Sequence, residues 1–364
     1  MNDSELLYLL ALQHVPNIGD ASAKKLLHHV GSAEGIFKEK KSNLLRIDGI
    51  GEARIKDLFD PVHRNAATAE LSYIKEHTVD VSYFMDSTYP ENLKHCLDGP
   101  LLLFSRGNIN LNNSKVISVV GTRKVTSHGI DFCNRLMEEL GPVNPIIVSG
   151  FAYGVDITAH KAAIKNNLQT IGCLAHGLNQ IYPKTHQKYT IQVEENGGFY
   201  TDFWSSDEFE RNNFLKRNRI IAGISQATIV IESAEKGGSL VTAEIANSYN
   251  RDVFAVPGRT SDSQSKGCNN LIKQQKAHLL TSAADLVYML GWQLDEKPAV
   301  QKSLFVELDA EEKAVYGVLK EGKLHLDQIA LNTDIAGYKI ASILLNMELN
   351  GLVRPLPGKL FELI

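Results

Sequence analysis

The sequence predicts an α/β protein built around an extended, mostly parallel β-sheet that helices cover on both faces. Two observations support this prediction. Between residues 116 and 256, six short β-rich runs alternate with stretches of helical character, and strands joined by helical crossovers form parallel sheets. The chain has 364 residues, of which 43% are hydrophobic and 22% charged, which is enough for two or three domains with ordinary cores.

The six predicted strands and their helices indicate a Rossmann-like domain over residues 116–292. We expect strands at residues 116–120, 145–149, 170–174, 198–203, 227–232 and 253–256, and helices that include residues 132–140, 157–166 and 240–250. Ligands bind such sheets beyond the carboxyl ends of the strands. The residues that follow each strand are therefore the first candidates for a functional site.

Residues 1–70 predict a helical domain with two similar turn–helix elements. Residues 15–20 lead into a helix at residues 23–27, and residues 47–52 lead into residues 53–55. The second turn, Gly49-Ile50-Gly51, resembles that of a helix-hairpin-helix or SAM-like domain, in which backbone N–H groups face a phosphate. In the first copy, Asn17 stands in place of the first glycine. Contact with DNA and a plain helical hairpin both remain open.

Residues 71–115 predict a connector with one candidate strand, an apolar run at residues 100–104 that ends before Gly107. After residue 292, Glu296-Lys297-Pro298 predicts a linker. Residues 300–364 then follow the order of a winged-helix-like domain, with three helices and a hairpin. The second and third helices are expected at residues 324–331 and 336–350, and the hairpin strands at residues 352–354 and 360–361, around a turn that contains Pro357-Gly358.

The third of these C-terminal helices would be the recognition helix of a DNA-binding winged helix. It offers only Lys339 as a positive side chain, although contacts with phosphates require several. DNA binding by this domain, contact with a protein and a structural role therefore all remain open.

The net charge excludes a uniformly basic surface, and the cysteine spacing argues against a zinc site. With 38 basic and 42 acidic residues the net charge is −4, so a polyanion has to be bound by a local patch. The four cysteines form no CxxC pair and have no histidines at zinc spacing, which indicates buried thiols and no metal site. The sequence predicts neither a signal peptide nor a membrane-spanning segment, so we expect a cytoplasmic protein without membrane contact.

Two glycine loops follow the first two predicted strands. Gly121-Thr122-Arg123 is a glycine turn with a guanidinium at its edge, which suits the oxygens of a phosphate. In the second loop, Gly150 and Gly154 precede a helix, whose start favours anions. Neither loop has the G-x-G-x-x-G pattern of dinucleotide-binding proteins, so no nucleotide cofactor is expected.

The most specific stretch follows the fourth strand and combines basic, amide and aromatic residues. Single-stranded DNA needs positive charge for its backbone and an aromatic face for a base. A basic helix start also opposes the helix dipole, which argues against a merely solvated helix. The residues of this stretch that we expect to contact DNA are Arg211, Phe214, Lys216, Arg217, Asn218 and Arg219.

A double-glycine loop follows the fifth strand and leads into a helix through Gly238, Ser239 and Thr242, a further candidate for phosphate binding. The same loop allows an alternative function. Its Gly-Gly and the later Glu244 resemble the Gly-Gly-x-Gly-Thr-x-x-Glu loop of nucleoside-monophosphate phosphoribohydrolases, although the spacing differs and the later glycine is absent. The alternative is therefore a nucleotide-processing enzyme on the same fold.

Taken together, the loops resemble those of the DNA-processing protein A family (DprA, also called Smf). The matching stretches occur in the family's order. They are residues 121–123, residues 149–156 with Ala159-His160, Tyr182-Pro183, residues 217–223, residues 238–243, residues 256–258 and residues 270–272, and Tyr89-Pro90 with Leu93 extends the match upstream. Leu215 stands where the family usually has proline, and this departure weakens a detailed transfer of the site's geometry.

The resemblance implies an extended Rossmann-like fold with an N-terminal helical domain and a C-terminal winged-helix-like domain. It also implies single-stranded DNA binding, homodimerisation and loading of the RecA recombinase onto incoming DNA in natural transformation, with no catalytic activity. The family's DNA-contacting positions correspond to Arg123 and to residues 214–219 of this chain.

Overall fold

The computed structural model describes residues 1–113, 115–292, 308–320, 322–350, 352–356 and 358–363. The chain divides into two compact units, Met1–Asp295 and Glu296–Ile364, and the C-terminal unit has a hydrophobic core of its own. The linker predicted at Glu296-Lys297-Pro298 and the first residues of the predicted domain at 300–364 lie outside the described residues.

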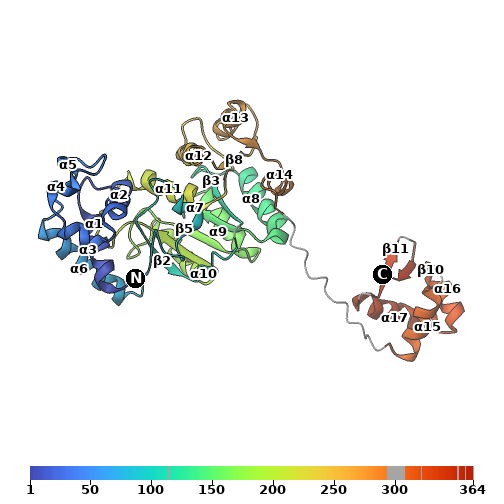
Figure 1. Cartoon of the computed structure of the whole chain (residues 1–364). Coiled ribbons are helices and arrows are strands. Elements are labelled where there is room, and N and C mark those ends of the chain that lie inside the picture. The colour runs from blue at the N-terminus through green and yellow to red at the C-terminus, as the bar shows by residue number, and fades with distance from the viewer. Residues whose placement is uncertain (114, 293–307, 321, 351, 357, 364) are drawn as a thin grey trace. The chain divides into compact units, whose positions relative to one another are not determined.

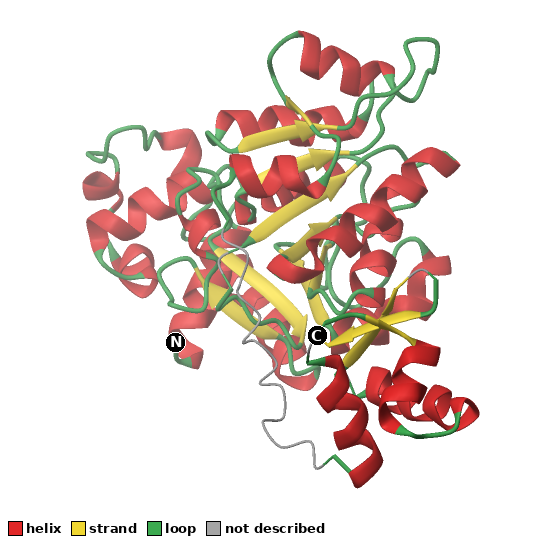
Figure 2. Ribbon diagram, turned by 90° about the vertical axis from the view of Figure 1, so that its right-hand side faces the viewer, coloured by secondary structure: helices red, strands yellow, loops and turns green. Residues whose placement is uncertain are grey.

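A nine-stranded sheet forms the centre of the first unit (Figure 2). Its strand order is β1-β2-β6-β5-β4-β3-β7-β8-β9; the pairs β1–β2 and β2–β6 are antiparallel and the other neighbours are parallel. All six predicted strands are present, which confirms the predicted mostly parallel sheet. The strands are β1 (Asp80–Tyr83), β2 (Leu102–Gly107), β3 (Val116–Val120), β4 (Ile146–Ser149), β5 (Thr170–Cys173), β6 (Gly197–Thr201), β7 (Ala227–Val230), β8 (Asp252–Ala255) and β9 (His278–Leu279).

Helices cover both faces of this sheet because successive side chains of its buried strands point to opposite faces. In β3, Ile117 and Val119 pack against one set of helices, and Val116 and Val120 against the other. The first set is α8 (Ser127–Leu140), α9 (Val155–Lys165) and α14 (Ala283–Met289), and the second is α7 (Glu91–Lys94), α11 (Asn213–Ile224), α12 (Gly238–Ser248) and α13 (Lys266–Lys273). Helix α10 (Thr190–Glu195) and the 3-10 turns η1 (Gly141–Val143) and η2 (Lys184–Tyr189) complete the connections. None of the helices among the described residues has the length and apolar character needed to cross a membrane.

Strand β3 lies between β4 and β7. From β3 the chain first adds β4, β5 and β6 towards one edge of the sheet, and it then returns to add β7, β8 and β9 towards the other edge. A crevice forms where the strand order reverses, outside the carboxyl ends of the strands. The loops after β3, β4 and β7 meet there. The topology therefore brings together three of the loops that the sequence singled out.

The predicted domain boundary at residue 116 is wrong, because β1 and β2 belong to the sheet rather than to a connector at residues 71–115. Residues 104–107 of β2 pair antiparallel with β6, so the apolar run predicted at residues 100–104 forms part of a buried strand. This strand ends at Gly107, which has a φ of 117°; a side chain there would meet the backbone oxygen of Gly197 at 2.5 Å.

The N-terminal helices gather at one end of the first unit (Figure 1). They are α1 (Asp3–His14), α2 (Asp20–Val30), α3 (Ala33–Lys38), α4 (Lys41–Leu44), α5 (Glu52–Ile55) and α6 (Pro61–Glu76). The two predicted turns lead into α2 and α5. Asn17 (φ 67°) adopts the left-handed conformation of its counterpart Gly49 (φ 76°), which asparagine tolerates better than most residues. The substitution therefore preserves the turn.

The C-terminal unit is a winged-helix domain, as the sequence predicts. Its elements are α15 (Ala310–Leu319), β10 (Leu324–His325), α16 (Leu326–Thr333), α17 (Gly337–Leu349), β11 (Val353–Leu356) and β12 (Leu360–Leu363), with strand order β10-β12-β11. The first two residues of the predicted second helix form β10 instead, because they pair with β12. Lys339 forms an ion pair with Glu311 at 2.5 Å. Pro357 of the predicted turn lies outside the described residues.

Candidate nucleic-acid interface

A groove with a volume of about 840 Å³ opens at the carboxyl ends of β3 and β7. Its walls are the loops after these strands, the segment before α11 and the first turns of α11 and α12. The fold thus collects side chains from widely separated parts of the chain. The predicted site residues that line it are Gly121, Thr122, Arg123, Arg211, Phe214, Arg217, Asn218, Gly238, Ser239 and Thr242.

The surface of the groove is strongly positive although the whole chain is acidic. Arg123, Lys124, Arg211 and Lys236 line the groove, are exposed, and form no ion pair with any residue that the structure describes. The only acidic side chain in the lining is Asp156, which is buried. Charges of one sign around a concave surface concentrate the electric field there, so this groove attracts anions.

Arg217 lies beneath the groove rather than on its surface, since only 4% of it is exposed. Its Nη1 donates a hydrogen bond to the backbone oxygen of Gly150 at 2.7 Å and another to that of Cys173. Arg217 thereby ties α11 to the ends of β4 and β5. Burial raises the pKa of the Asp156 carboxyl, and the positive charge of Arg217 opposes this rise.

The two glycines predicted to contact phosphate in the second loop have packing roles. At Gly150, a Cβ would lie 2.6 Å from both the Arg217 guanidinium and the Asp156 carboxylate. Gly154 has a φ of 78°, and a side chain there would meet the backbone oxygen of Thr122 at 2.2 Å. Neither glycine lines the groove. Their absent side chains allow the second loop to support the first, which carries Arg123.

An aromatic cluster forms one end of the groove. The ring centroids of Tyr182 and Phe209 are 4.7 Å apart, and those of Phe209 and Phe214 are 5.6 Å apart. The guanidinium of Arg123 lies over the Phe214 ring, 5.0 Å from its centroid. Phe214 is therefore partly covered, whereas Tyr182 and Phe209 are 39% and 40% exposed.

Tyr182 and Phe209 are site residues that the sequence analysis missed, as are Lys124 and Lys236. Each lies within a few residues of a position that the analysis did select or in a loop that follows a strand. Such a position can be recognised in the sequence, but it does not show whether an aromatic ring is exposed or buried.

The helix starts around the groove differ in their capacity for an anion. At α8 the site is filled by the chain itself, because Glu232 accepts hydrogen bonds from the backbone N–H of Thr126 at 2.9 Å and from its hydroxyl at 2.5 Å. At α12, by contrast, the N-cap residue Gly237 provides no side-chain cap. Thr242 is 2% exposed and lines the groove, and its hydroxyl has no hydrogen-bond partner among the described residues. The start of α12 is therefore open to a phosphate.

Besides Gly150 and Gly154, two further predicted site residues do not line the groove. The Arg219 guanidinium pairs with Asp20 at 3.1 Å and with Asp202, and it donates a hydrogen bond to the backbone oxygen of Asp98. The prediction that Arg219 contacts DNA is therefore not supported by its position: it joins α2 to the sheet. Lys216 is exposed on α11 but does not line the groove.

The residue on which the enzymatic alternative depends also lies elsewhere. Glu244 does not line the groove; its carboxylate is 64% exposed and lies 3.9 Å from the Lys276 ammonium. Among the described residues, no group of three or more histidine, cysteine, aspartate and glutamate side chains is placed to hold a metal ion.

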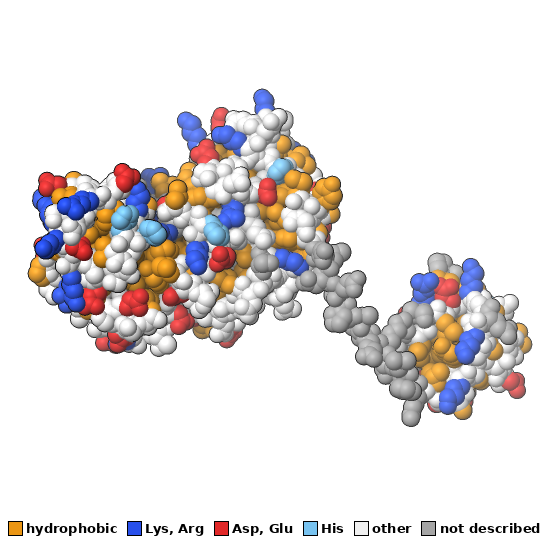
Figure 3. All heavy atoms as spheres, viewed as in Figure 1, with side chains coloured by type: hydrophobic (Ala, Val, Ile, Leu, Met, Phe, Trp, Pro, Cys, Tyr) orange, Lys and Arg blue, Asp and Glu red, His pale blue; other side chains and the backbone are white. Residues whose placement is uncertain are grey.

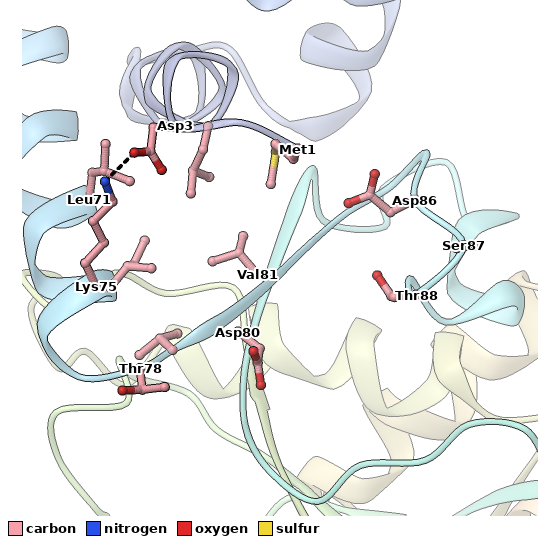
Figure 4. Close-up of a pocket in the computed structure, with 13 residues that line it drawn as sticks. Met1, Asp3, Leu71, Lys75, Thr78, Asp80, Val81, Asp86, Ser87 and Thr88 are labelled. Carbon is pink, nitrogen blue, oxygen red and sulfur yellow. Dashed lines mark hydrogen bonds and ion pairs between the residues drawn. The ribbon is translucent and has the colours of Figure 1, made fainter.

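A separate cavity of about 640 Å³ lies between α1, α6 and β1, and it contains three carboxylates. Figure 4 shows that they do not converge: Asp3 is joined to Lys75, whereas Asp80 and Asp86 lie on other segments and point elsewhere. This cavity therefore has no arrangement that indicates a bound cation or catalysis.

Comparisons with protein-family models match both units. Residues 80–291 match the model of the DNA recombination-mediator protein A family, and residues 301–359 match the DprA winged helix domain. Among curated proteins, Protein Smf of Synechocystis sp. is 29% identical in an alignment of 400 positions that covers the whole of both chains. The DNA processing protein DprA of Streptococcus pneumoniae is 36% identical over 203 residues, which are 56% of this chain and 71% of that protein.

Two solved structures support the same relationship. The X-ray structure of DprA from Streptococcus pneumoniae matches with a TM-score of 0.66 and 31% identity, over 78% of this chain and 96% of that one. A DprA structure from Helicobacter pylori, whose description concerns its single-stranded DNA binding mode, matches with a TM-score of 0.53 and 26% identity, over 58% and 95% of the two chains. With its fold, its loop sequences and both family models in agreement, this chain belongs to the DNA recombination-mediator protein A family.

Proposed function

We propose that this protein binds single-stranded DNA in the groove at the carboxyl ends of β3 and β7 and delivers the strand to the RecA recombinase. Membership of the family supports a role in DNA processing and recombination. The observation that carries the DNA-binding proposal is a set of four exposed cations around one groove, which have no ion pair within the described part of the chain: Arg123, Lys124, Arg211 and Lys236.

The exposed aromatic rings of the groove favour a single strand over a duplex. A single strand has free bases, and the exposed rings of Tyr182 and Phe209 provide faces or edges for them beside the cations. Stacking of one base on an aromatic side chain is worth roughly 1–3 kcal/mol. We assign one backbone phosphate to the uncapped start of α12, where Gly238, Ser239 and Thr242 meet.

The experiment that tests this proposal is a fluorescence-anisotropy titration of the full chain with a labelled oligonucleotide, single-stranded or duplex, over a range of salt concentrations. We expect tighter binding of the single strand and a log–log salt slope of roughly −0.7 per phosphate neutralised. Equal affinity for duplex, or binding that does not depend on salt, would contradict it.

Delivery to RecA requires a second measurement, since DNA binding alone does not demonstrate it. We expect this protein to shorten the lag before RecA hydrolyses ATP on single-stranded DNA that is already covered by a single-strand-binding protein. A variant that no longer binds DNA should leave the lag unchanged. Analytical ultracentrifugation of the same preparations tests the homodimer that the family resemblance implies.

A further inference from the structure

A second cavity, of about 790 Å³, lies between the N-terminal helices and the sheet, and it shares no lining residue with the DNA-binding groove. Helix α2, the turn at residues 47–48, the segment after β1 and the end of α7 form its walls. We call it the α2–α7 cavity. Nothing in the proposed function requires it.

Its walls combine positive charge with few acids. The lysines Lys24, Lys25 and Lys94 line it, together with His28, His29 and His95. The only acidic side chain in the lining is Asp48, whose carboxylate lies 4.0 Å from the Lys25 ammonium. A net positive hollow on a chain of net charge −4 favours an anionic ligand.

The same cavity also has an unusual apolar component. Met85 and Leu97 line it and are 63% and 86% exposed. Figure 3 shows histidine, basic and hydrophobic side chains next to one another on this face, over α2 and α7. Single exposed apolar residues are common, but apolar side chains grouped in a hollow with a polar rim mark binding surfaces.

The aromatic rings of the cavity distinguish between two kinds of anionic ligand. A nucleotide would need a free ring face for its base, yet the Lys24 ammonium lies over the Phe84 ring, 5.1 Å from its centroid. Tyr83 is 8% exposed, and its hydroxyl contacts the Met85 sulfur at 3.5 Å. Besides the exposed imidazoles of His28, His29 and His95, the available contacts are flexible aliphatic side chains and ammonium groups, which suit a peptide.

We propose that the α2–α7 cavity docks an acidic peptide segment of a partner protein, with apolar side chains of the peptide against Met85 and Leu97 and its carboxylates on the lysines. Burial lowers the pKa of Lys24, and the charges of Asp20 and Asp98 offset this only in part, so an incoming carboxylate would add charge compensation there. Charge complementarity selects the partner, and the apolar contacts supply affinity.

The test is a fluorescence-anisotropy titration of the full chain with a labelled nine-residue peptide that alternates aspartate with leucine and phenylalanine. Two further peptides provide controls: one has serine in place of every apolar residue, and the other has lysine in place of every aspartate. We expect only the first peptide to bind. Absence of binding at millimolar protein, or equal binding of the serine peptide, would overturn the proposal, as would displacement of the bound peptide by dTMP.

Variants locate the site. The double substitution Lys25→Glu with Lys94→Glu should weaken peptide binding at least tenfold, and so should Leu97→Ser, which changes an exposed side chain and leaves the fold undisturbed. Lys165→Glu, on α9 and outside the cavity, is the matched control and should change nothing. The affinity for single-stranded DNA should stay the same in Leu97→Ser. Peptide binding that persists in both cavity variants would show that the cavity is not the site.

Discussion

At the level of single residues, the four arginines that the sequence predicts to contact DNA divide into two kinds. Arg123 and Arg211 are exposed on the groove without ion pairs among the described residues, whereas Arg217 and Arg219 are held inside the fold by carbonyl and carboxylate oxygens. Only the first kind can exchange water for phosphate without losing an existing partner. The two kinds therefore differ in what their removal should do.

Arg123→Ala should weaken single-strand binding about tenfold to a hundredfold, because a hydrogen bond to a charged group contributes about 1.5–3 kcal/mol. The thermal midpoint should stay close to that of the unmodified protein, since Arg123 is exposed. The measurement is an anisotropy titration beside a thermal melt, with Lys165→Ala as the control for loss of one surface charge. An unchanged affinity would remove Arg123 from the interface.

A second residue-level prediction concerns the dependence of stability on pH. Burial lowers the pKa of His160 to about 3, and its Nδ1 lies 2.7 Å from the Thr170 hydroxyl. The unfolded chain therefore binds a proton that the folded chain does not, so His160 favours folding above pH 6.5 and this contribution declines as the pH falls from 6.5 towards 3.

The predicted slope is up to about 1.4 kcal/mol per pH unit for this one group. Urea denaturation between pH 7 and 5 should therefore give a steeper loss of stability in the unmodified protein than in His160→Gln, which carries no titrating group at that position. Parallel curves for the two proteins would contradict the assignment.

At the level of secondary-structure elements, the starts of α8 and α12 differ in whether the chain supplies its own anion. Glu232 fills the start of α8, whereas the start of α12 has no side-chain cap. A carboxylate placed at the start of α12 should therefore act as a substitute for the phosphate. Gly238 is a suitable position, because a Cβ there would have no neighbour within 4 Å.

Gly238→Asp should weaken single-strand binding at least tenfold while leaving stability unchanged or raising it by about 0.3–1 kcal/mol through the helix dipole. Gly238→Asn has nearly the same shape without the charge and should retain most of the affinity. Anisotropy titrations and urea denaturation of both variants measure the two effects. Equal loss in both variants would indicate a steric effect instead of a phosphate site.

At the level of the whole molecule, ion pairs join the N-terminal helices to the sheet of the first unit. Arg219 pairs with Asp20 of α2 and with Asp202 after β6, and its side chain is only 15% exposed. These contacts connect two regions that the sequence analysis treated as separate domains. They belong to one compact unit.

Arg219→Ala should destabilise the protein by about 3–5 kcal/mol, because two partly buried carboxylates would lose their partner. The affinity of the folded protein for single-stranded DNA should change less than twofold. Urea denaturation and an anisotropy titration separate these effects. A large loss of affinity in protein that remains folded would return Arg219 to the interface.

Much of the architecture could be predicted because its signals are local. All six strands predicted after residue 115 are present, and so are the two N-terminal turns and the winged-helix order. The edge strand β1 was missed because its four residues have no clear alternation and gain their structure by pairing with β2. Tyr182 and Phe209 were missed as site residues because the exposure of a ring depends on how segments that are distant in sequence pack together.

The sequence by itself determined the fold class, the order of the strands and helices along the chain, and the family, because hydrophobic periodicity and loop motifs are properties of consecutive residues. Only the tertiary structure decided which cations face the groove. Arg217 and Arg219 occupy the same short stretch as the predicted DNA contacts, but Gly150, Cys173, Asp20 and Asp202 surround them in the fold. Burial and ion pairing depend on partners that are distant in sequence, and a linear pattern does not contain them.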